Sequence, residues 1–245
     1  MPAFNAAKTI RASIESVVNQ TYKDWELIVI DDYSADNTTE LVKSIDDSRI
    51  RLIINEQNLG TSSTRNIGII EAISDWIAFL DSDDIWHKDK LEKHLHFIIK
   101  TNADISYTGT SYMNKSGQIS KYNLPAVQEF NYKNLLRRNI MSCSSVIVRR
   151  ELMKTALFEK GFIHEDYVAW LKILRKVEYA YGLNEPLLIY RLSANSKSSG
   201  RIHSAIQTYG AYRAVGYNKI YSFCLTLRYS LHSISKRCRI KRGFI

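Results

Sequence analysis

A short apolar run that ends in a cluster of acids is the feature that most constrains how this chain can fold. Residues 76–80 are apolar and bounded by polar residues, which predicts a buried strand. Asp81, Asp83 and Asp84 follow at once, and three carboxylates cannot be buried together without partners. Their oxygens suit Mg²⁺ or Mn²⁺, ions that commonly also hold substrate phosphates. Taken alone, however, such a turn is more often a solvated helix cap.

The first hundred residues alternate between strands and helices. Strands are expected at 26–30, 50–54 and 76–80, and helices at 38–46, 61–73 and 88–100. This alternation predicts βαβ units, and therefore an α/β fold whose mostly parallel sheet carries helices on both faces. In the helix at 61–73, Ile67, Ile70 and Ile73 are expected to share the buried face.

The pattern changes after residue 103. A hairpin is expected from strands at 105–113 and 119–124 around a turn at 114–117. Further strands are predicted at 145–148, 178–183 and 186–192, with a helix at 165–176. The serine-rich stretch 193–200 has the composition of a mobile loop.

Two of the predicted strands end in paired acids. Asp31 and Asp32 follow the strand at 26–30, and Asp81 and Asp83 follow the strand at 76–80. In open α/β sheets, ligands bind outside the carboxyl ends of the strands. We therefore predict one site that uses all four carboxylates, although helix capping would explain either pair alone.

Basic charge is concentrated at the C-terminal end. Residues 201–245 hold nine of the 34 Lys and Arg residues and no Asp or Glu, so residues 1–200 are neutral overall. Tyrosines are interspersed with these basic residues, and such a basic helical tail is typical of membrane-surface binders. It could instead pack on the rest of the chain. Nucleic acid is a weaker alternative partner, because no recognition motif accompanies the charge.

Cysteine usage and hydropathy exclude several classes of protein. Cys143, Cys224 and Cys238 are widely spaced and form no Cys-x-x-Cys pair. This argues against a disulfide framework or a thiolate zinc site and favours a reducing, cytoplasmic location. No run approaches the roughly 18 apolar residues that a bilayer span requires.

Five short motifs, in this order, resemble those of the family 2 glycosyltransferases, which are inverting enzymes with a GT-A fold. They are Pro2-Ala3-Phe4-Asn5, Ile28-Val29-Ile30-Asp31-Asp32-Tyr33-Ser34-Ala35-Asp36, Asn58-Leu59-Gly60 with Arg65-Asn66-Ile67-Gly68, Asp81-Ser82-Asp83-Asp84, and His164-Glu165-Asp166-Tyr167. In addition, Tyr190-Arg191 with Ser196 and Ser198 resembles a loop that covers the nucleotide in relatives. The resemblance covers about residues 1–200 and implies a GT-A-like (Rossmann-like) sheet.

The resemblance also implies a nucleotide-sugar donor, a divalent metal (Mg²⁺ or Mn²⁺), and transfer of the sugar to a hydroxyl with inversion. Asp32 matches the residue that reads the base, for which a uracil imide would be the natural partner. Asp83 matches the metal ligand. Asp166 matches the general base, with Glu165 as the alternative base or its partner. The residues implied in donor binding are Pro2, Phe4, Asp31, Asp32, Asn58, Arg65, Asp81, Ser82 and Arg191.

These expectations combine into one proposed organisation. Residues 1–113 form a nucleotide-sugar-binding half, residues 114–200 form the acceptor and catalytic-base half of the same domain, and residues 201–245 form the basic tail. The expected activity is transfer from a UDP-sugar to a glycan or lipid-linked acceptor in surface polysaccharide synthesis, at the inner face of the cytoplasmic membrane and without nucleic acid. Two alternatives stay open: a nucleotide-sugar-binding protein without turnover, and a nucleotidyltransferase, which would need an N-terminal glycine-rich loop with a basic residue.

The chain departs from the family pattern at its first strand. Relatives have a complete strand before the Pro-x-Phe-Asn segment, whereas Met1 falls at the last position of that strand. We expect the strand to lack about five or six residues, the usual length of a strand. Restoring them is expected to raise stability and turnover. Tyr33 is a milder departure, because relatives often carry a small residue such as glycine there.

Overall fold

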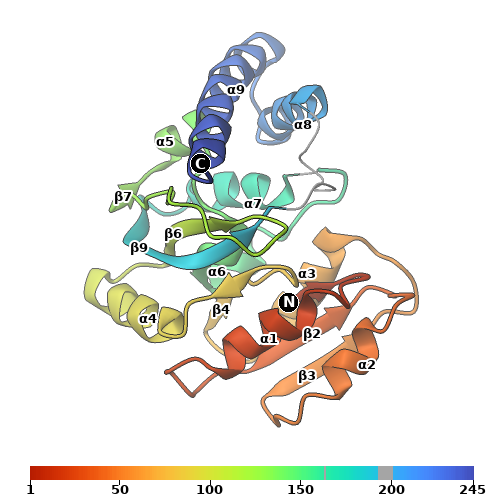
Figure 1. Cartoon of the computed structure of the whole chain (residues 1–245). Helices are drawn as coiled ribbons and strands as arrows, with labels where there is room; N and C mark the ends of the chain where they lie inside the picture. The colour runs from red at the N-terminus through yellow and green to blue at the C-terminus, as the bar shows by residue number, and fades with distance from the viewer. Residues whose placement is uncertain (163, 193–200) are drawn as a thin grey trace.

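The computed structural model describes residues 1–162, 164–192 and 201–245. The strands are β1 (Pro2–Ala3), β2 (Leu27–Asp31), β3 (Ile50–Ile54), β4 (Trp76–Ala78), β5 (Ile85–Trp86), β6 (Ile105–Met113), β7 (Glu129–Phe130), β8 (Val146–Arg149) and β9 (Ala180–Arg191). The α-helices are α1 (Ile10–Val18), α2 (Thr38–Lys43), α3 (Thr61–Glu71), α4 (Lys90–Thr101), α5 (Tyr132–Arg137), α6 (Arg150–Lys154), α7 (Glu165–Ile173), α8 (Arg201–Ala214) and α9 (Lys219–Arg242), and η1 (Cys143–Ser145) is a 3₁₀ turn. Figure 1 shows how these elements are arranged.

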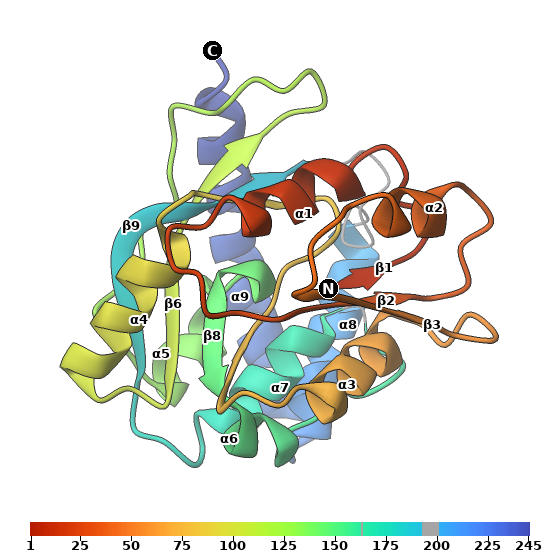
Figure 2. The ribbon, with the colours of Figure 1, turned by 90° about the horizontal axis from the view of Figure 1, so that it is seen from below.

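The smaller sheet is parallel, with strand order β1-β2-β3. Helices α1 and α2 lie on one of its faces and α3 lies on the other (Figure 2). Because both faces are covered, every residue of β2 is buried, and its sequence is an apolar run rather than an alternating pattern. The predicted parallel sheet with helices on both faces is therefore present in this part of the chain.

The larger sheet is mixed, with strand order β4-β8-β6-β9-β5 and β7 paired to β9. Strand β8 runs antiparallel to β4 and β6, whereas β6 and β9 are parallel. The prediction of two strands at 178–183 and 186–192 was wrong, because β9 is continuous. Its register shifts opposite Gly109, so the residues between Leu183 and Leu188 bulge out and Pro186 is accommodated without ending the strand.

The buried face of helix α3 differs from the one predicted from the spacing of Ile67, Ile70 and Ile73. Ile70 is 63% exposed and Ile73, which lies beyond the end of the helix, is 80% exposed. The buried positions include Arg65 and Ile69 instead. The buried ion pairs of Arg65 stabilise this orientation of the helix although it leaves two isoleucines exposed. The prediction from apolar spacing alone was therefore wrong about the buried face.

The predicted hairpin forms only in part. β6 is present as expected, and Gly117 adopts φ +85° in the turn, a conformation that glycine favours. The second arm makes only isolated antiparallel bridges, Thr110 to Leu124 and Met113 to Ile119, and is not a continuous strand.

The C-terminal tail is helical and packs on the rest of the chain. Helices α8 and α9 lie at the opposite end of the molecule from β3 (Figure 1). The ring of Tyr229 on α9 lies 5.3 Å from that of Tyr167 on α7, and the Lys121 amide donates to the Gly243 carbonyl at 2.7 Å. Within the described ranges, no helix is both long and apolar enough to cross a membrane.

Candidate active site

The loops that follow β1 and β2 are joined into one rim of the smaller sheet. The Asn5 amide donates to the Ser34 hydroxyl at 2.9 Å, and that hydroxyl donates to Asp31 at 2.6 Å. Phe4, beside Asn5, is 51% exposed, and Pro2 is half-buried in β1. The rim therefore presents an accessible aromatic ring, whereas the Asp31 carboxylate that helps to hold its loops together is buried.

Asp32 is buried and binds the turn that begins α3. Its carboxylate accepts hydrogen bonds from the Asn55 side chain at 2.8 Å and from the amides of Leu59 and Gly60 at 2.8 and 2.9 Å. Burial alone would raise the pKa of Asp32, but these hydrogen bonds lower it overall. A carboxylate has about four acceptor positions, so most of those of Asp32 are occupied within the protein. The side chain of Asn58, in contrast, is exposed.

Arg65 lies one turn into α3 and joins two acidic segments. Its guanidinium donates to Asp81 at 2.5 Å and to Glu165 at 2.7 Å. Burial alone would lower the pKa of Arg65. Asp81 and the other acidic groups nearby have the larger combined effect, so the pKa is raised well above its ordinary value. Arg65 thus connects the residues after β4 with the first residue of α7, and it is a permanent buried charge.

The acidic turn after β4 is held from two sides. The Asp81 amide donates to the Ser144 hydroxyl at 3.0 Å. Arg191, the last residue of β9, donates through its amide to Asp84 at 3.0 Å and through Nε to the Asp83 carbonyl at 2.9 Å. Ser82 is half-buried in the same turn. The geometry of this turn therefore depends on η1 and β9, far away in sequence.

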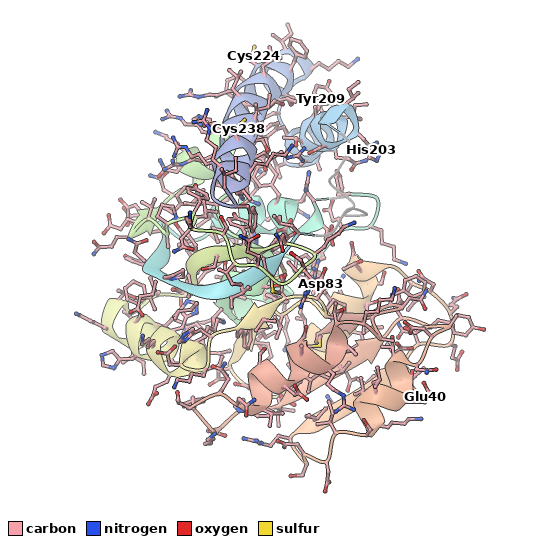
Figure 3. The ribbon with its side chains drawn as sticks, viewed as in Figure 1. Glu40, Asp83, His203, Tyr209, Cys224 and Cys238 are labelled. Atoms are coloured by element: carbon pink, nitrogen blue, oxygen red, sulfur yellow. The ribbon has the colours of Figure 1, made fainter. Side chains whose placement is uncertain are left out.

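The turn is rich in negative charge. Burial, followed by repulsion from Asp81, raises the pKa of Asp83 to about 6. Burial and both neighbouring carboxylates raise the pKa of Asp84 well above its ordinary range, and among the described residues its Oδ2 finds no hydrogen-bond donor. A divalent cation bound here would relieve this repulsion. In the view of Figure 3, Asp83, which is half-buried, lies between the N-terminal layer and the tail helices.

The donor set fits Mg²⁺ or Mn²⁺ held jointly with a substrate. No cluster of three or more His, Cys, Asp or Glu side chains is poised for a metal in the part of the chain that the structure describes. Mg²⁺ commonly takes only one or two protein carboxylates and completes its shell with water and substrate phosphates. Asp83 offers hard carboxylate oxygen atoms suited to that role, and a bound cation would favour its ionised form.

Asp166 and Glu165 lie in the first turn of α7 but have different partners. The Glu165 carboxylate is bound by Arg65, whereas Asp166 accepts from the Tyr167 amide at 2.8 Å. Burial raises the pKa of Asp166, and Arg65 partly opposes that shift. The structure therefore makes Glu165 an ion-pair partner and leaves Asp166 the better candidate for proton transfer.

Several residues of the site region were missed by the sequence reasoning. Asn55 donates a hydrogen bond to Asp32, and the Ser144 hydroxyl accepts one from the acidic turn. Lys236 of α9 lies near enough to Asp166 to lower its pKa. Burial lowers the pKa of Lys236 to about 8. Of these three residues, only Ser144 lies in a recognisable sequence pattern, the serine-rich run at 142–145. The expected contributions of Ser196, Ser198 and the loop 193–200 fall outside the described residues.

Comparisons with known proteins identify the family of the chain and its fold. The sequence profile described as "Glycosyl transferase family 2" matches residues 1–155. Escherichia coli WfgD, a UDP-Glc:α-D-GlcNAc-diphosphoundecaprenol β-1,3-glucosyltransferase, is 40% identical over 204 residues, covering 82% of this chain and 79% of the relative. TuaG of Bacillus subtilis, named for teichuronic acid biosynthesis, is 35% identical over 216 residues, covering 87% and 86%. The fold matches S. aureus TarS in complex with UDP-GlcNAc at a TM-score of 0.73 and 19% identity, over 92% of this chain and 68% of TarS.

We predict that Arg65→Ala destabilises the protein by about 3–5 kcal/mol, because it leaves the buried Glu165 carboxylate without its partner. Arg51→Ala is the matched control. Arg51 of β3 pairs at 3.1 Å with Glu71 of α3, the helix that carries Arg65, but both side chains are more than 40% exposed, so the loss of this pair should cost about 0–1 kcal/mol. Urea unfolding of both variants measures the difference. Equal losses would contradict a structural role for the buried pair.

Proposed function

Because the chain belongs to glycosyl transferase family 2, we propose that it transfers a sugar from a UDP-sugar to a hydroxyl of a lipid-linked glycan, with inversion at the anomeric carbon. The observation that carries this proposal is the double ion pair of Arg65, which unites the acidic turn after β4 with the start of α7. The donor and acceptor named for WfgD support the choice of a UDP-sugar and a diphosphate-linked lipid. The name of TuaG supports a cell-surface polymer as the product.

The donor nucleotide is placed at the rim of the smaller sheet. The exposed ring of Phe4 offers a stacking surface for the base, and we assign Pro2 of β1 and Asp31 of β2 to the same end of the site. Since the acceptors of Asp32 are largely occupied, we assign it chiefly to positioning α3 and the pocket wall. The exposed Asn58 side chain is free to turn toward the nucleotide at the same edge.

Asp83 is the residue proposed to hold the metal. A bound Mg²⁺ or Mn²⁺ would act as a Lewis acid on the diphosphate and stabilise the charge of the leaving group. Asp81 is restrained by Arg65, so it is placed to contact the ribose or the sugar. Ser82 lies between them in the turn, and Arg191 keeps the turn in position from β9.

Asp166 is the proposed general base. As the acceptor hydroxyl oxygen forms its bond to the anomeric carbon, the bond from that carbon to the phosphate oxygen breaks and UDP leaves. The hydroxyl proton passes to the Asp166 carboxylate, whose raised pKa makes it a better proton acceptor than an ordinary aspartate. A single displacement from the opposite face inverts the configuration and needs no covalent sugar intermediate.

We predict that Asp166→Asn lowers kcat by about 10²–10⁴-fold and leaves UDP affinity unchanged, because it removes only proton transfer. For the wild type, kcat/KM should fall as the pH drops through the raised pKa of Asp166, above the ordinary value of about 3.9. UDP release in the presence of acceptor gives both quantities. A variant with normal turnover and the same acidic limb would show that another group is the base.

We predict that Asp83→Asn abolishes the increase in UDP-sugar affinity that Mn²⁺ gives the wild type, because it removes a metal-ligand oxygen charge. Asp46→Asn, at an exposed position, is the control and should bind as the wild type does. Titration calorimetry with Mn²⁺ and with EDTA provides the comparison. If metal-dependent binding survives in Asp83→Asn, the metal is held elsewhere.

The tail is proposed to bind the surface of the membrane that holds the acceptor. One face of α9 packs inward, whereas apolar side chains at three- and four-residue spacing form an exposed stripe on another face: Ile220, Phe223, Leu227, Leu231 and Ile234. Exposed basic residues accompany this stripe, among them Lys219, Arg228 and Arg239. Apolar insertion and attraction to anionic lipid together supply the two signals that stable attachment needs.

We predict that the double change Leu227→Glu and Leu231→Glu abolishes co-sedimentation with vesicles containing anionic lipid, because it places two charges on the inserted stripe. Ile99→Glu is the control, since Ile99 on α4 is 80% exposed but lies away from the tail. Circular dichroism should show that both proteins keep their helices. Binding of the double variant at wild-type strength would exclude the stripe as the membrane contact.

A further inference from the structure

The inward face of α9 carries a lysine. The residues of this helix that are shielded from solvent recur at three- and four-residue spacing: Ser222, Leu225, Thr226, Tyr229, Ser233, Lys236 and Ile240. Tyr229 packs on Tyr167, and Ile240 belongs to the same apolar core as Tyr167. Lys236 lies between these two contacts on the same face, where packing alone would favour an apolar side chain. Its charge therefore calls for another explanation than the packing of the tail.

The ammonium group of Lys236 is not paired within the protein. Lys236 makes no hydrogen bond or ion pair with another of the described residues, and Asp166 is the acid that lies near enough to influence it. The Asp166 carboxylate accepts its hydrogen bond from the Tyr167 amide instead. The cost of shielding a cation from water is therefore only partly offset within the chain.

Other cations around the proposed base are already engaged. Arg65 is held by two carboxylates, and Arg191 donates to the acidic turn after β4. Helix α7, which carries Asp166, lies between the larger sheet and the tail helices (Figure 1). Lys236 therefore approaches Asp166 from the tail, and no carboxylate has to be displaced before this lysine binds an anion.

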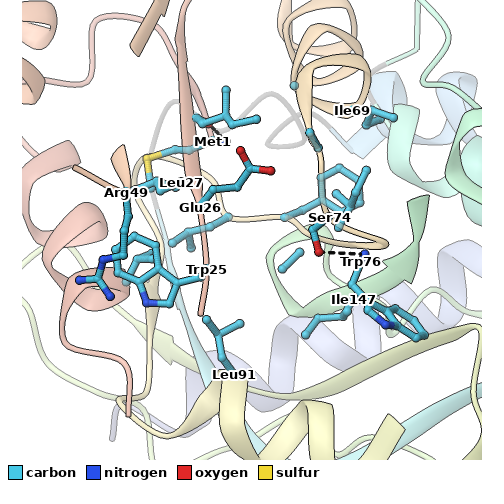
Figure 4. A pocket seen from close by; sticks show the side chains of 18 of the residues that line it. Met1, Trp25, Glu26, Leu27, Arg49, Ile69, Ser74, Trp76, Leu91 and Ile147 are labelled. Atoms are coloured by element: carbon cyan, nitrogen blue, oxygen red, sulfur yellow. Dashed lines mark hydrogen bonds between the residues drawn. The ribbon is translucent and has the colours of Figure 1, made fainter. Parts of the chain in front are cut away.

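An apolar groove between the two sheets is an alternative place for a lipid-linked substrate. It has a volume of about 660 Å³ and is lined largely by apolar residues of both sheets (Figure 4). Two arginines border it, but Arg49 pairs with Asp47 at 2.6 Å and stacks on Trp25 at 3.7 Å. The other, Arg65, is doubly paired. The groove thus offers apolar surface, but neither of its arginines is free to bind a phosphate.

We propose that Lys236 is a phosphate-binding residue of the acceptor site, and that it binds the diphosphate that joins the acceptor sugar to its lipid. This inference rests on the proposed function, which supplies a lipid-linked diphosphate acceptor and places its hydroxyl at Asp166. The diphosphate is attached to the same sugar as that hydroxyl, so it lies one sugar ring away from the base, on the side where the lysine approaches.

A lysine suits this task because its ammonium is a compact charge on a flexible stem and can follow a phosphate as the sugar moves. The proposal also gives the two faces of α9 separate roles. The outer face carries the exposed apolar stripe proposed to enter the membrane, and the inner face holds the charged group of the acceptor at the membrane surface.

The test compares two acceptors in solution without membranes: GlcNAc joined through a diphosphate to a hexyl chain, and hexyl GlcNAc without phosphate. GlcNAc is the acceptor sugar named for WfgD. The assay is run at neutral pH, where Lys236 is largely protonated because its pKa is about 8. We expect Lys236→Met to raise KM for the diphosphate acceptor about 10–100-fold, as for the loss of a hydrogen bond to a charged group, and to leave KM for the phosphate-free acceptor unchanged.

Two variants serve as controls. Lys236→Arg keeps the charge and should retain most of the affinity for the diphosphate acceptor. Lys241→Met changes an exposed position of the same helix and should behave as the wild type does. Equal losses on both acceptors for Lys236→Met would show that the lysine acts through Asp166 or through the packing of α9, and the proposal would be wrong.

Stability separates binding from folding. Methionine fills a similar space without bringing a charge, so Lys236→Met should unfold at the same urea concentration as the wild type or at a higher one. If this variant is instead less stable and binds the diphosphate acceptor normally, the lysine is a structural residue and the proposal fails.

A binding measurement keeps this inference distinct from the proposed reaction. Titration calorimetry with the diphosphate acceptor, in the presence of UDP and Mn²⁺ to fill the donor site, should show tighter binding to the wild type than to Lys236→Met. If it does so while no sugar is transferred, the proposed function is wrong but the phosphate site stands. Equal affinities would overturn the site.

Membrane phospholipid is the other source of phosphate. Lys236→Met should co-sediment with vesicles of anionic lipid as strongly as the wild type, because the lysine is on the inward face of α9. Weaker co-sedimentation together with an unchanged KM for the diphosphate acceptor would mean that the lysine binds lipid head groups, which contradicts the proposal.

Discussion

The site depends on one buried guanidinium. Arg65 reaches the acidic turn after β4 with one nitrogen and the first residue of α7 with another, so three segments distant in sequence share a fixed charge. A lysine would provide the charge without the forked geometry that engages two carboxylates. The position of α3 is in turn set by Asp32, whose carboxylate holds the Leu59–Gly60 turn. Asp32 thus positions α3, and Arg65 on α3 positions two further acids, Asp81 and Glu165.

Local sequence predicted the elements that are buried on both faces. Strand β2, which is buried throughout, is shifted by one from the prediction, because a covered parallel strand is necessarily a short apolar run. Strand β3 spans the predicted residues although it is only partly buried. Prediction failed where tertiary contacts decide the result. The inward face of α3 carries Arg65 and Ile69, whereas Ile70 is exposed. Strand β9 continues past Pro186 because a bulge accommodates the proline. Helix α1 went unpredicted, although Ile10, Ile14 and Val17 share its buried side.

The acids at strand ends were predicted from the rule that parallel strands place their carboxyl ends at one edge, but the two pairs follow strands of different sheets, β2 in the smaller sheet and β4 in the larger one. Their individual partners could not be predicted. Glu165 and Asp166 are adjacent acids, and the sequence does not show which of them is available as a base. Only the contact of Glu165 with Arg65, a hundred residues earlier, distinguishes the two. Asn55 and Ser144 have side chains that suit many environments, so their roles follow from the surrounding fold. Tyr33 shows the reverse case, since its φ of +66° explains why glycine suits that position.

The tyrosines behind the proposed base make the tail hard to exchange. Tyr167 immediately follows Asp166, and its hydroxyl lies 2.9 Å from that of Tyr212 on α8; these two hydroxyls donate to the carbonyls of Leu135 and Leu136. His164 and Ser204 add a second link, at 3.0 Å. Grafting the C-terminal helices of another transferase would therefore disturb the hydrogen bonding of Tyr167, the residue next to the proposed base. Swaps intended to change the acceptor or the membrane need to keep Tyr167 and Tyr212, together with Tyr229 of α9, whose ring lies 5.3 Å from that of Tyr167.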